Sequence, residues 1–167
     1  MYYGIFELMI RLGDGNMSKC EEEFCSCSCS CFKAEIRTQI TILEDSDTIC
    51  DLLKELQDNS INLDGYYYQN IECDINIFTF EVGNEKEQSS SDLRTVECLL
   101  KKWCIDYLEN DTVRVFINNN TPKILAKIYC ALSDSLDVYS SYYAQRKGIY
   151  IETSDNCKAI NIINSLN

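Results

Sequence analysis

The sequence predicts an α+β fold in which a mixed, mainly antiparallel β-sheet packs against about four helices, in the order ββαβ and then αβαββα. Some stretches alternate apolar and polar residues, which is the period of a strand, and others repeat apolar residues every three or four positions, which is the period of a helix. With 167 residues, the chain is most simply a single domain, 1–167, able to bury about 70% of the surface of its unfolded form. A subdomain boundary is expected near 83–91, a polar stretch that contains three consecutive serines.

Two strands are expected at the start of the chain. Residues 2–12 are rich in aromatic and β-branched residues, and residues 13–19 contain turn-forming glycine and asparagine, so a hairpin leads into a second strand within 24–43. In the second strand the apolar residues change from odd to even positions after Cys31, which predicts a bulge there or a break between two strands. The even-numbered apolar residues are Phe32, Ala34, Ile36, Ile40 and Ile42.

A helix and a third strand come next. The helix is expected over about 46–58, because Asp45 or the serine after it can cap its N-terminus and apolar residues then recur at helical spacing. Asp64 and Gly65 predict a turn, and the strand 71–82 that follows is apolar on both faces near its end, as in a central strand covered on two sides. The apolar side of the helix consists of Ile49, Leu52, Leu53 and Leu56.

The second half of the chain alternates helices and strands. Helical spacing predicts a helix over about 92–109, with the only tryptophan facing inward, and a β-rich composition predicts a short strand over 113–117. Pro122 follows Thr121 and predicts the start of another helix, because proline is tolerated in the first helical turn. The remaining expected elements are strands at 138–144 and 149–152 and a final helix capped by Ser154 or Asp155.

Histidine is absent from the chain, and its absence excludes several kinds of active site. Ser-His-Asp and Cys-His arrangements cannot be built, nor can catalytic zinc sites with histidine ligands. The chain has no glycine-rich phosphate loop, and helix capping explains the acids Glu44, Asp45 and Asp47 better than magnesium binding does. We therefore expect no catalytic residues, no enzymatic activity and no cofactor.

The eleven cysteines admit two interpretations. Cysteine and serine alternate from Cys25 to Cys31, so a strand would place these thiols on one face as small apolar side chains of a core. A thiolate metal site would instead need a loop, because same-face neighbours in a strand lie about 6.5 to 7 Å apart and thiolates on one zinc about 4 Å apart. The candidate metal ligands are Cys20, Cys25, Cys27, Cys29 and Cys31. The odd number of cysteines, without a secretory signal or membrane span, predicts reduced thiols in the reducing environment of the cytoplasm.

The net charge of −12 is concentrated in the first half of the chain. Residues 1–83 contain 16 acidic and 5 basic side chains, whereas residues 84–167 contain 11 acidic and 10 basic ones. The electric field of this negative charge repels nucleic acid and anionic membranes, and it attracts basic protein surfaces. We expect a basic protein partner, with no direct binding of nucleic acid or membrane, and the oligomeric state is left open.

A stripe of acids on the first helix is the candidate binding surface. Spacings of four, four and three place these acids on one face, where like charges cost a few tenths of a kcal/mol per pair. Glu55 and Asp58 lie too far from the N-terminus for the helix dipole to offset this cost. The candidate partner-binding residues are Asp47, Asp51, Glu55 and Asp58 on the stripe, Glu21, Glu22 and Glu23 before it, and Tyr66, Tyr67 and Tyr68, since tyrosine is enriched at interfaces.

Together these observations predict a non-enzymatic acidic binding or inhibitor protein that docks its N-terminal half on a basic protein surface, of a kind that can itself bind nucleic acid. Immunity proteins, antitoxins and phage anti-defence inhibitors act in this way, by presenting carboxylates where phosphates would lie. Two alternatives remain open. One is a thiolate metal-binding protein that uses Cys20 to Cys31, and the other is a small-ligand sponge or sensor with a pocket lined by Tyr66, Tyr67 and Tyr68.

Overall fold

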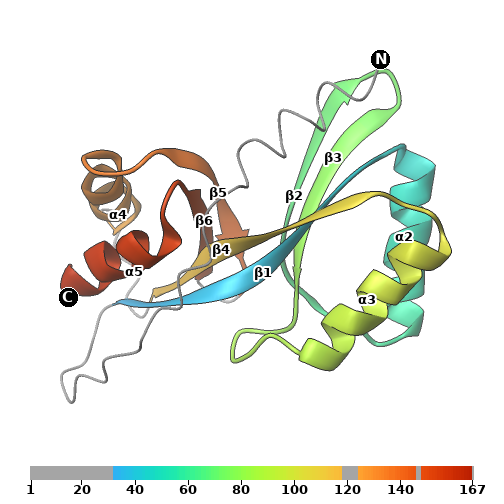
Figure 1. Ribbon diagram of the computed structural model, residues 1–167, viewed down its shortest axis with the longest axis horizontal. Coiled ribbons are helices and arrows are strands. Elements are labelled where there is room, and N and C mark those ends of the chain that lie inside the picture. Colours follow the sequence, from blue (N-terminus) through green and yellow to red (C-terminus); the bar gives the residue numbers. More distant parts are fainter. Residues whose placement is uncertain (1–31, 118–123, 146–147, 167) are drawn as a thin grey trace.

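The computed structural model describes residues 32–117, 124–145 and 148–166 of the chain. In this part of the chain, six strands and four helices follow one another in the order βαββαβαββα (Figure 1). The strands are β1 (Phe32–Glu44), β2 (Leu63–Glu72), β3 (Ile75–Val82), β4 (Tyr107–Ile117), β5 (Val138–Ala144) and β6 (Gly148–Thr153). The helices are α2 (Ser46–Asp58), α3 (Ser90–Lys102), α4 (Ile124–Ser133) and α5 (Asn156–Ser165).

The six strands close into an antiparallel barrel in the order β1-β3-β2-β5-β6-β4. β1 pairs with β4 continuously from Phe32 to Ile42, whereas β2 pairs with β5 through one pair, Gly65 with Ala144. The expected mixed sheet packed against helices is therefore wrong, because every neighbouring pair of strands is antiparallel and the sheet closes on itself.

The barrel is polar inside and apolar outside, and this explains why the sequence pattern did not reveal that the sheet closes. On β1, Ile40 and Ile42 are fully buried in the apolar cluster beneath the helices. Gln39 and Thr41 alternate with them on the barrel side, where Gln39 donates across the interior to Tyr142 and Thr41 forms a hydrogen bond with Thr79 of the neighbouring strand β3. Alternation of this kind is typical of a sheet with one covered and one solvated face. Here closure of the sheet buries the polar face as well.

Two apolar clusters lie outside the barrel, one beneath each pair of helices. Figure 1 shows α2 and α3 together at one end of the molecule and α4 and α5 together at the other. At one end, α2 and α3 cover β1 and β3 and bury Leu52 and Leu100 completely. At the other end, α4 and α5 cover β4, β6 and the first part of β1, and Ile128 and Ile163 are fully buried there. Because each such side chain contributes about 1.5 to 3 kcal/mol when it is buried, the helices stabilise the barrel from outside.

Several local expectations are confirmed. Asp45 caps α2 by accepting a hydrogen bond from the Thr48 backbone N–H at 2.8 Å, and Asp155 caps α5 by accepting one from the Lys158 N–H at 2.9 Å. β5 has the expected bounds, Val138–Ala144, and β6 extends one residue beyond its expected range at each end. The even-numbered apolar residues of β1 all pack in the two clusters beneath the helices.

The stretch expected as a single strand over 71–82 is part of a hairpin formed by β2 and β3. Its turn includes Asp74, which has a φ of 63°, a left-handed conformation that aspartate tolerates better than most residues do. Asp64 and Gly65 were expected to form a turn, but they lie inside β2 at a β-bulge. The turn prediction at this pair is therefore wrong.

α3 is shorter than its expected range of 92–109. It ends at Lys102, Trp103 caps it, and Cys104 adopts a φ of 57°, so the chain leaves the helix before β4 begins. The helical spacing of apolar residues continues beyond this end because Trp103 and Tyr107 also pack against the first apolar cluster.

The polar stretch at 83–91 connects β3 to α3 and packs against the barrel. The Gln88 side chain accepts from the Thr38 N–H at 2.9 Å and donates to the Thr38 carbonyl at 2.7 Å. Gly83 has a φ of 132°, and a Cβ there would lie 2.6 Å from the Glu87 carbonyl oxygen. This connection therefore requires glycine at its first position.

Some expectations concern residues outside the described ranges: the strand at 2–12, the alternating cysteines at 25–31, and the helix start at Thr121 and Pro122. Among the helices that the structure describes, none is both long enough and apolar enough to cross a membrane.

Candidate functional site: the acidic helix and the polar barrel interior

The acidic face of α2 consists of Asp47, Asp51, Glu55 and Asp58. The three aspartates are exposed and Glu55 is half-buried. The one basic side chain of α2 is Lys54, whose Nζ lies 2.7 Å from Asp51 Oδ1, and because both side chains are largely exposed this pair is weak. Each of the other three described helices has more basic than acidic side chains, so α2 is the negatively charged helix of the described structure.

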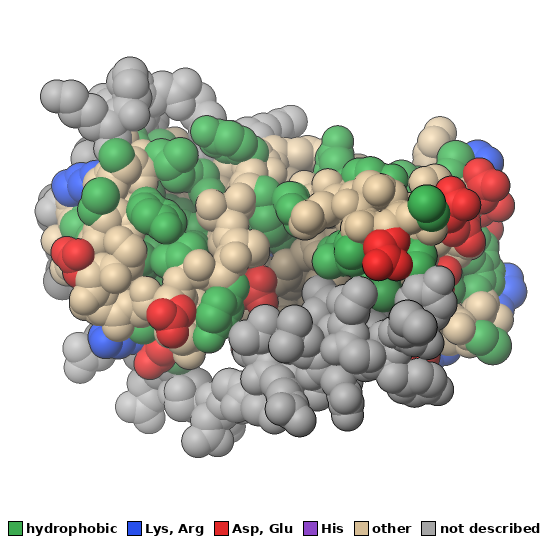
Figure 2. All heavy atoms as spheres, turned by 90° about the horizontal axis from the view of Figure 1, so that it is seen from above, with side chains coloured by type: hydrophobic (Ala, Val, Ile, Leu, Met, Phe, Trp, Pro, Cys, Tyr) green, Lys and Arg blue, Asp and Glu red, His purple; other side chains and the backbone are tan. Residues whose placement is uncertain are grey.

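Further acids surround the N-terminal end of α2. Glu44 ends β1, and the pKa of its carboxyl is raised, first by burial and then by the charges of Asp45 and Asp106. The pKa of Asp45 is lowered because the backbone and side chain of Thr48 donate hydrogen bonds to it. Figure 2 shows several acidic side chains gathered at the end of the molecule that α2 and α3 form. The negative field of the acidic face therefore extends past the start of the helix.

Tyr66, Tyr67 and Tyr68 all lie on β2, but they do not share a face. The Tyr66 ring lies tilted against that of the buried Phe78 on the helix side of the sheet. The Tyr68 hydroxyl lies 3.4 Å from Ser46 Oγ at the start of α2. Tyr67 lies on the barrel side, with its ring centre 6.0 Å from that of Tyr142. The structure thus brings Tyr68 to the N-terminal end of α2 and places Tyr67 beside the barrel interior.

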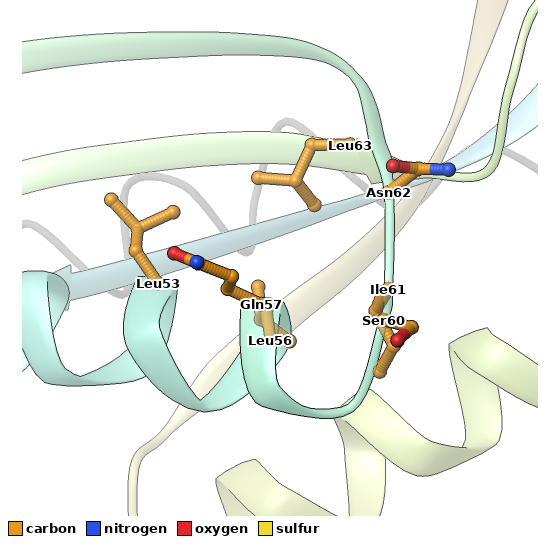
Figure 3. A pocket seen from close by; sticks show the side chains of 7 residues that line it. All are labelled: Leu53, Leu56, Gln57, Ser60, Ile61, Asn62 and Leu63. Atoms are coloured by element: carbon orange, nitrogen blue, oxygen red, sulfur yellow. The ribbon is translucent and has the colours of Figure 1, made fainter.

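A shallow groove of about 450 Å³ lies between the end of α2 and the start of β2 (Figure 3). Leu53, expected on the buried side of the helix, is 40% exposed here and forms one wall. Helical spacing places Leu53 and Gln57 on the opposite flank of α2 from the acidic face. The groove is lined by Leu53, Leu56, Gln57, Ser60, Ile61, Asn62 and Leu63.

A buried cluster of charged and aromatic residues fills the barrel where β2 meets β5. Arg114 and Asp64 are both fully buried, and the Arg114 guanidinium donates to both oxygens of the Asp64 carboxylate through Nε and Nη2. Tyr150 Oη donates to the same carboxylate at 2.8 Å. Arg114 also donates to the carbonyl oxygens of Gln145 and Glu85, at 3.3 and 3.4 Å. The ion pair therefore connects β4 to β2, with further bonds to β6 and two loops.

Glu81 is the second fully buried carboxyl of this cluster. Tyr142 Oη donates to Glu81 Oε1, and Gln39 Nε2 donates to Tyr142 Oη at 3.1 Å. Burial raises the pKa of Glu81 to about 8, an effect that the hydrogen bond from Tyr142 partly offsets and the charge of Asp64 reinforces. Burial, and then the charge of Glu81, also raise the pKa of the Tyr142 hydroxyl. At neutral pH, Glu81 is therefore largely protonated and Tyr142 is neutral.

The shape of β2 brings these groups together. A bulge between Leu63 and Gly65 directs the Asp64 side chain into the barrel, where Arg114 contacts it. A Cβ at Gly65 would lie 2.8 Å from ring carbons of Tyr150 and 3.0 Å from a carboxyl oxygen of Glu81. Glycine at this position therefore allows the aromatic ring and the carboxyl to pack against the strand.

Three buried polar atoms of the barrel lack a hydrogen bond to any described residue: Arg37 Nη2, Gln39 Oε1 and Glu81 Oε2. Arg37 Nη2 lies against the Glu35 carboxylate as an ion pair without hydrogen-bond geometry, while Arg37 Nε donates to it at 2.6 Å. Arg37 is thus paired in charge. Glu81 forms no ion pair with a described residue, although Arg114 and Arg37 lie near enough to favour its ionised form, and its Oε2 has no hydrogen-bond donor there.

This barrel cluster was not predicted from the sequence. A signal was present, because Glu81 and Arg114 each stand between two apolar residues of a strand and so interrupt a β-rich pattern with a charge. The pattern shows that such a residue lies on the polar face, but not that the polar face is enclosed. The cluster comprises Asp64, Glu81, Arg114, Tyr142 and Tyr150.

The remaining candidate residues lie outside the described ranges. These are Glu21, Glu22 and Glu23 and the candidate thiolate ligands Cys20, Cys25, Cys27, Cys29 and Cys31. Within the part of the chain that the structure describes, no group of three Cys, Asp or Glu side chains is arranged to hold a metal ion.

No protein-family model matches the chain, and neither does any curated protein sequence. Several solved structures are similar in fold. Protein BT0572 from Bacteroides thetaiotaomicron is 22% identical with a TM-score of 0.65, over 80% of this chain and 90% of that one. The ligand-free regulatory subunit of aspartate kinase from Thermus thermophilus is 12% identical with a TM-score of 0.56, over 80% of this chain and 95% of that one. The aspartate kinase of Clostridium acetobutylicum is 13% identical with a TM-score of 0.51, over 80% of this chain and 33% of that one.

At these identities the similarity establishes the fold alone. The regulatory subunit from Thermus thermophilus is matched over nearly its whole length, whereas the complete kinase from Clostridium acetobutylicum is matched over a third of its length. The described chain, a closed barrel of six antiparallel strands covered by four helices, therefore has a fold similar to that of the regulatory subunit of aspartate kinase from Thermus thermophilus.

Proposed function

We propose that this chain is a non-enzymatic regulatory protein that binds a protein partner by docking the acidic face of α2 on a basic surface. The observation that carries this proposal is the charge of α2, which presents three exposed aspartates and one half-buried glutamate. No other helix in the described ranges carries net negative charge.

The carboxylates of the acidic face repel one another, and this repulsion destabilises α2. Like charges four residues apart destabilise a helix, and Glu44, Asp45 and Asp106 add negative charge at its N-terminal end. A basic partner would relieve this repulsion and would be attracted over about 8 Å at physiological ionic strength. Tyr68, beside the start of α2, offers an aromatic contact at the edge of the same surface.

Two observations support a regulatory role without catalysis. The fold resembles a regulatory subunit over 95% of that subunit's length. In addition, Glu81, whose pKa burial raises to about 8, is fully buried inside the barrel and does not line the groove beside α2.

An inhibitor is one form that this role can take. If the partner's basic surface binds nucleic acid, the carboxylates of α2 would occupy the positions of phosphates, as in immunity proteins, antitoxins and phage anti-defence inhibitors. We further propose that the protein works in the reducing cytoplasm. Five free, exposed thiols of the described residues support this proposal, whereas the disulfide-bonded Cys157 departs from the expected reduced state. The five free thiols of this part of the chain are Cys50, Cys73, Cys98, Cys104 and Cys130.

The test is capture of the partner from native lysate at low salt, identification of the partner, and titration of the purified pair. The variant that changes the acidic face carries Asp51→Lys together with Asp58→Lys. We expect it to bind the partner at least tenfold more weakly, equivalent to about 1.4 kcal/mol, and its affinity to depend less on salt. The matched control is Asp134→Lys with Asp137→Lys, which changes the net charge equally at exposed positions beyond α4. Equal affinities of the two variants for the partner would refute the proposal.

A further inference from the structure

The barrel closes where β2 meets β5, and this junction, called the β2–β5 seam below, has little backbone pairing. Besides the pair Gly65–Ala144, it contains two hydrogen bonds from Gln145, whose N–H donates to the Asp64 carbonyl at 2.6 Å and whose Nε2 donates to the Leu63 carbonyl at 2.8 Å. The β1–β4 ladder on the other side of the barrel is continuous over most of both strands. The barrel is therefore joined firmly along β1–β4 and weakly along β2–β5.

Side chains of the buried cluster cross this weak seam. Tyr142 of β5 donates to Glu81 of β3, and the ring of Tyr142 stacks between those of Tyr67 and Tyr150, at centre-to-centre distances of 6.0 and 5.6 Å. Asp64 of β2 accepts hydrogen bonds from residues of β4 and β6. Much of the attraction across the seam thus depends on two buried carboxyls.

The charge balance of the cluster depends on the protonation of Glu81. Within the cluster, Arg114 forms an ion pair with Asp64. Beside it, Arg37 pairs with Glu35, which also pairs with the exposed Lys33. A proton on Glu81 leaves the cluster neutral, whereas its loss adds an unpaired negative charge beside Asp64. The groups around Glu81 are Arg37 and Gln39 from β1, Asp64 from β2, Arg114 from β4, Tyr142 from β5 and Tyr150 from β6.

We propose that Glu81 is a proton-controlled latch of the barrel: when protonated it keeps the β2–β5 seam closed, and when it loses the proton the seam opens while β1 and β4 stay paired. This inference does not depend on docking by α2, because the latch lies inside the barrel and the acidic face lies outside it.

The physical reason is the environment of Glu81 Oε2. This atom is buried and has no hydrogen-bond donor among the described residues, so an ionised carboxylate would lack solvation in the closed barrel. Opening between β2 and β5 would admit water to Glu81 and Asp64 together. Because an exposed Glu81 would release its proton near pH 4.5 and burial raises its pKa in the closed barrel to about 8, opening should become easier as pH rises between these values.

The test is amide hydrogen exchange of the full chain across this pH range, corrected for intrinsic exchange rates. The reporter is the Gln145 N–H, and the β1–β4 amides are the internal reference. In the wild type, protection of the reporter relative to the reference should fall at least tenfold from pH 6 to 8. In Glu81→Gln, which keeps an acceptor for Tyr142 but cannot ionise, the relative protection should not depend on pH.

Glu152→Gln is the matched control, because burial also raises the pKa of Glu152 and Ser140 donates to its carboxylate. This variant should retain the wild-type pH profile. Identical profiles for the wild type and Glu81→Gln, or loss of the transition in Glu152→Gln, would overturn the proposal. If Glu81→Gln does not fold, the Glu81 carboxyl of the wild type can be titrated by carbon-13 NMR instead. A titration midpoint near pH 8 with parallel shifts at Gln145 would support the latch, and an ordinary carboxyl midpoint would overturn it.

Discussion

Replacing Asp64 with asparagine removes the counter-charge of a fully buried arginine. The Arg114 guanidinium would keep two carbonyl acceptors, Gln145 O at 3.3 Å and Glu85 O at 3.4 Å, both of them long hydrogen bonds. Breaking a buried ion pair by removing one partner costs about 3 to 5 kcal/mol, which is a large share of the roughly 5 to 15 kcal/mol that stabilises a typical domain. We expect Asp64→Asn to lower the free energy of unfolding by an amount in this range of about 3 to 5 kcal/mol, because Tyr150 loses its charged hydrogen-bond acceptor as well.

Urea denaturation followed by circular dichroism measures this cost. With a slope of about 2 kcal/mol per molar urea, the midpoint should fall by roughly 2 M. The control is Asp51→Asn, which breaks a pair with Lys54 that is largely exposed, and its midpoint should match that of the wild type. The double variant Asp64→Asn with Arg114→Met should be more stable than Asp64→Asn alone, because it no longer buries an unpaired charge. Equal midpoints for Asp64→Asn and Asp51→Asn would refute the assignment of a sealed ion pair inside the barrel.

Three further predictions concern stability. Folded Glu81 retains its proton up to about pH 8 whereas the unfolded chain releases it near 4.5, so wild-type stability should fall as pH rises between these values, by up to about 1.4 kcal/mol per pH unit. Thermal unfolding of Glu81→Gln should lack that part of the pH dependence, and equal slopes for both proteins would contradict the raised pKa. Gly65→Ala should destabilise the fold by about 1 to 3 kcal/mol in urea, because its Cβ would lie 2.8 Å from the Tyr150 ring, and an unchanged midpoint would show that the ring moves freely. Asp155→Ala should cost about 1 kcal/mol through loss of the α5 cap, and an unaltered melting temperature would show that this cap is dispensable.

The elements that were predicted correctly depend on local signals. Asp45 and Asp155 cap helices by binding backbone N–H groups three residues further on, so the signal and the contact lie in the same short stretch. The acidic face of α2 follows from helical spacing alone. The separation of Tyr67 from Tyr66 and Tyr68 was also accessible, because a strand sends alternate residues to opposite faces.

Closure of the barrel could not be predicted from these signals. A polar face turned to water and a polar face enclosed by other strands produce the same alternation in sequence. The contacts that distinguish them join Asp64 to Arg114 and Tyr150, which are 50 and 86 residues away along the chain. Asp64 and Gly65 were interpreted as a turn for the same reason, since their role in the bulge becomes evident only from these distant partners.

The most direct test of the proposed docking is a hydrogen-exchange footprint of the full chain with its identified partner at physiological salt. We predict added protection over α2, Ser46–Asp58, and at Tyr68, with no added protection over α4 and α5. The added protection should weaken as salt is raised, because exposed charges are then screened. A footprint confined to α4 and α5, or one on α2 that does not respond to salt, would contradict docking through the acidic face.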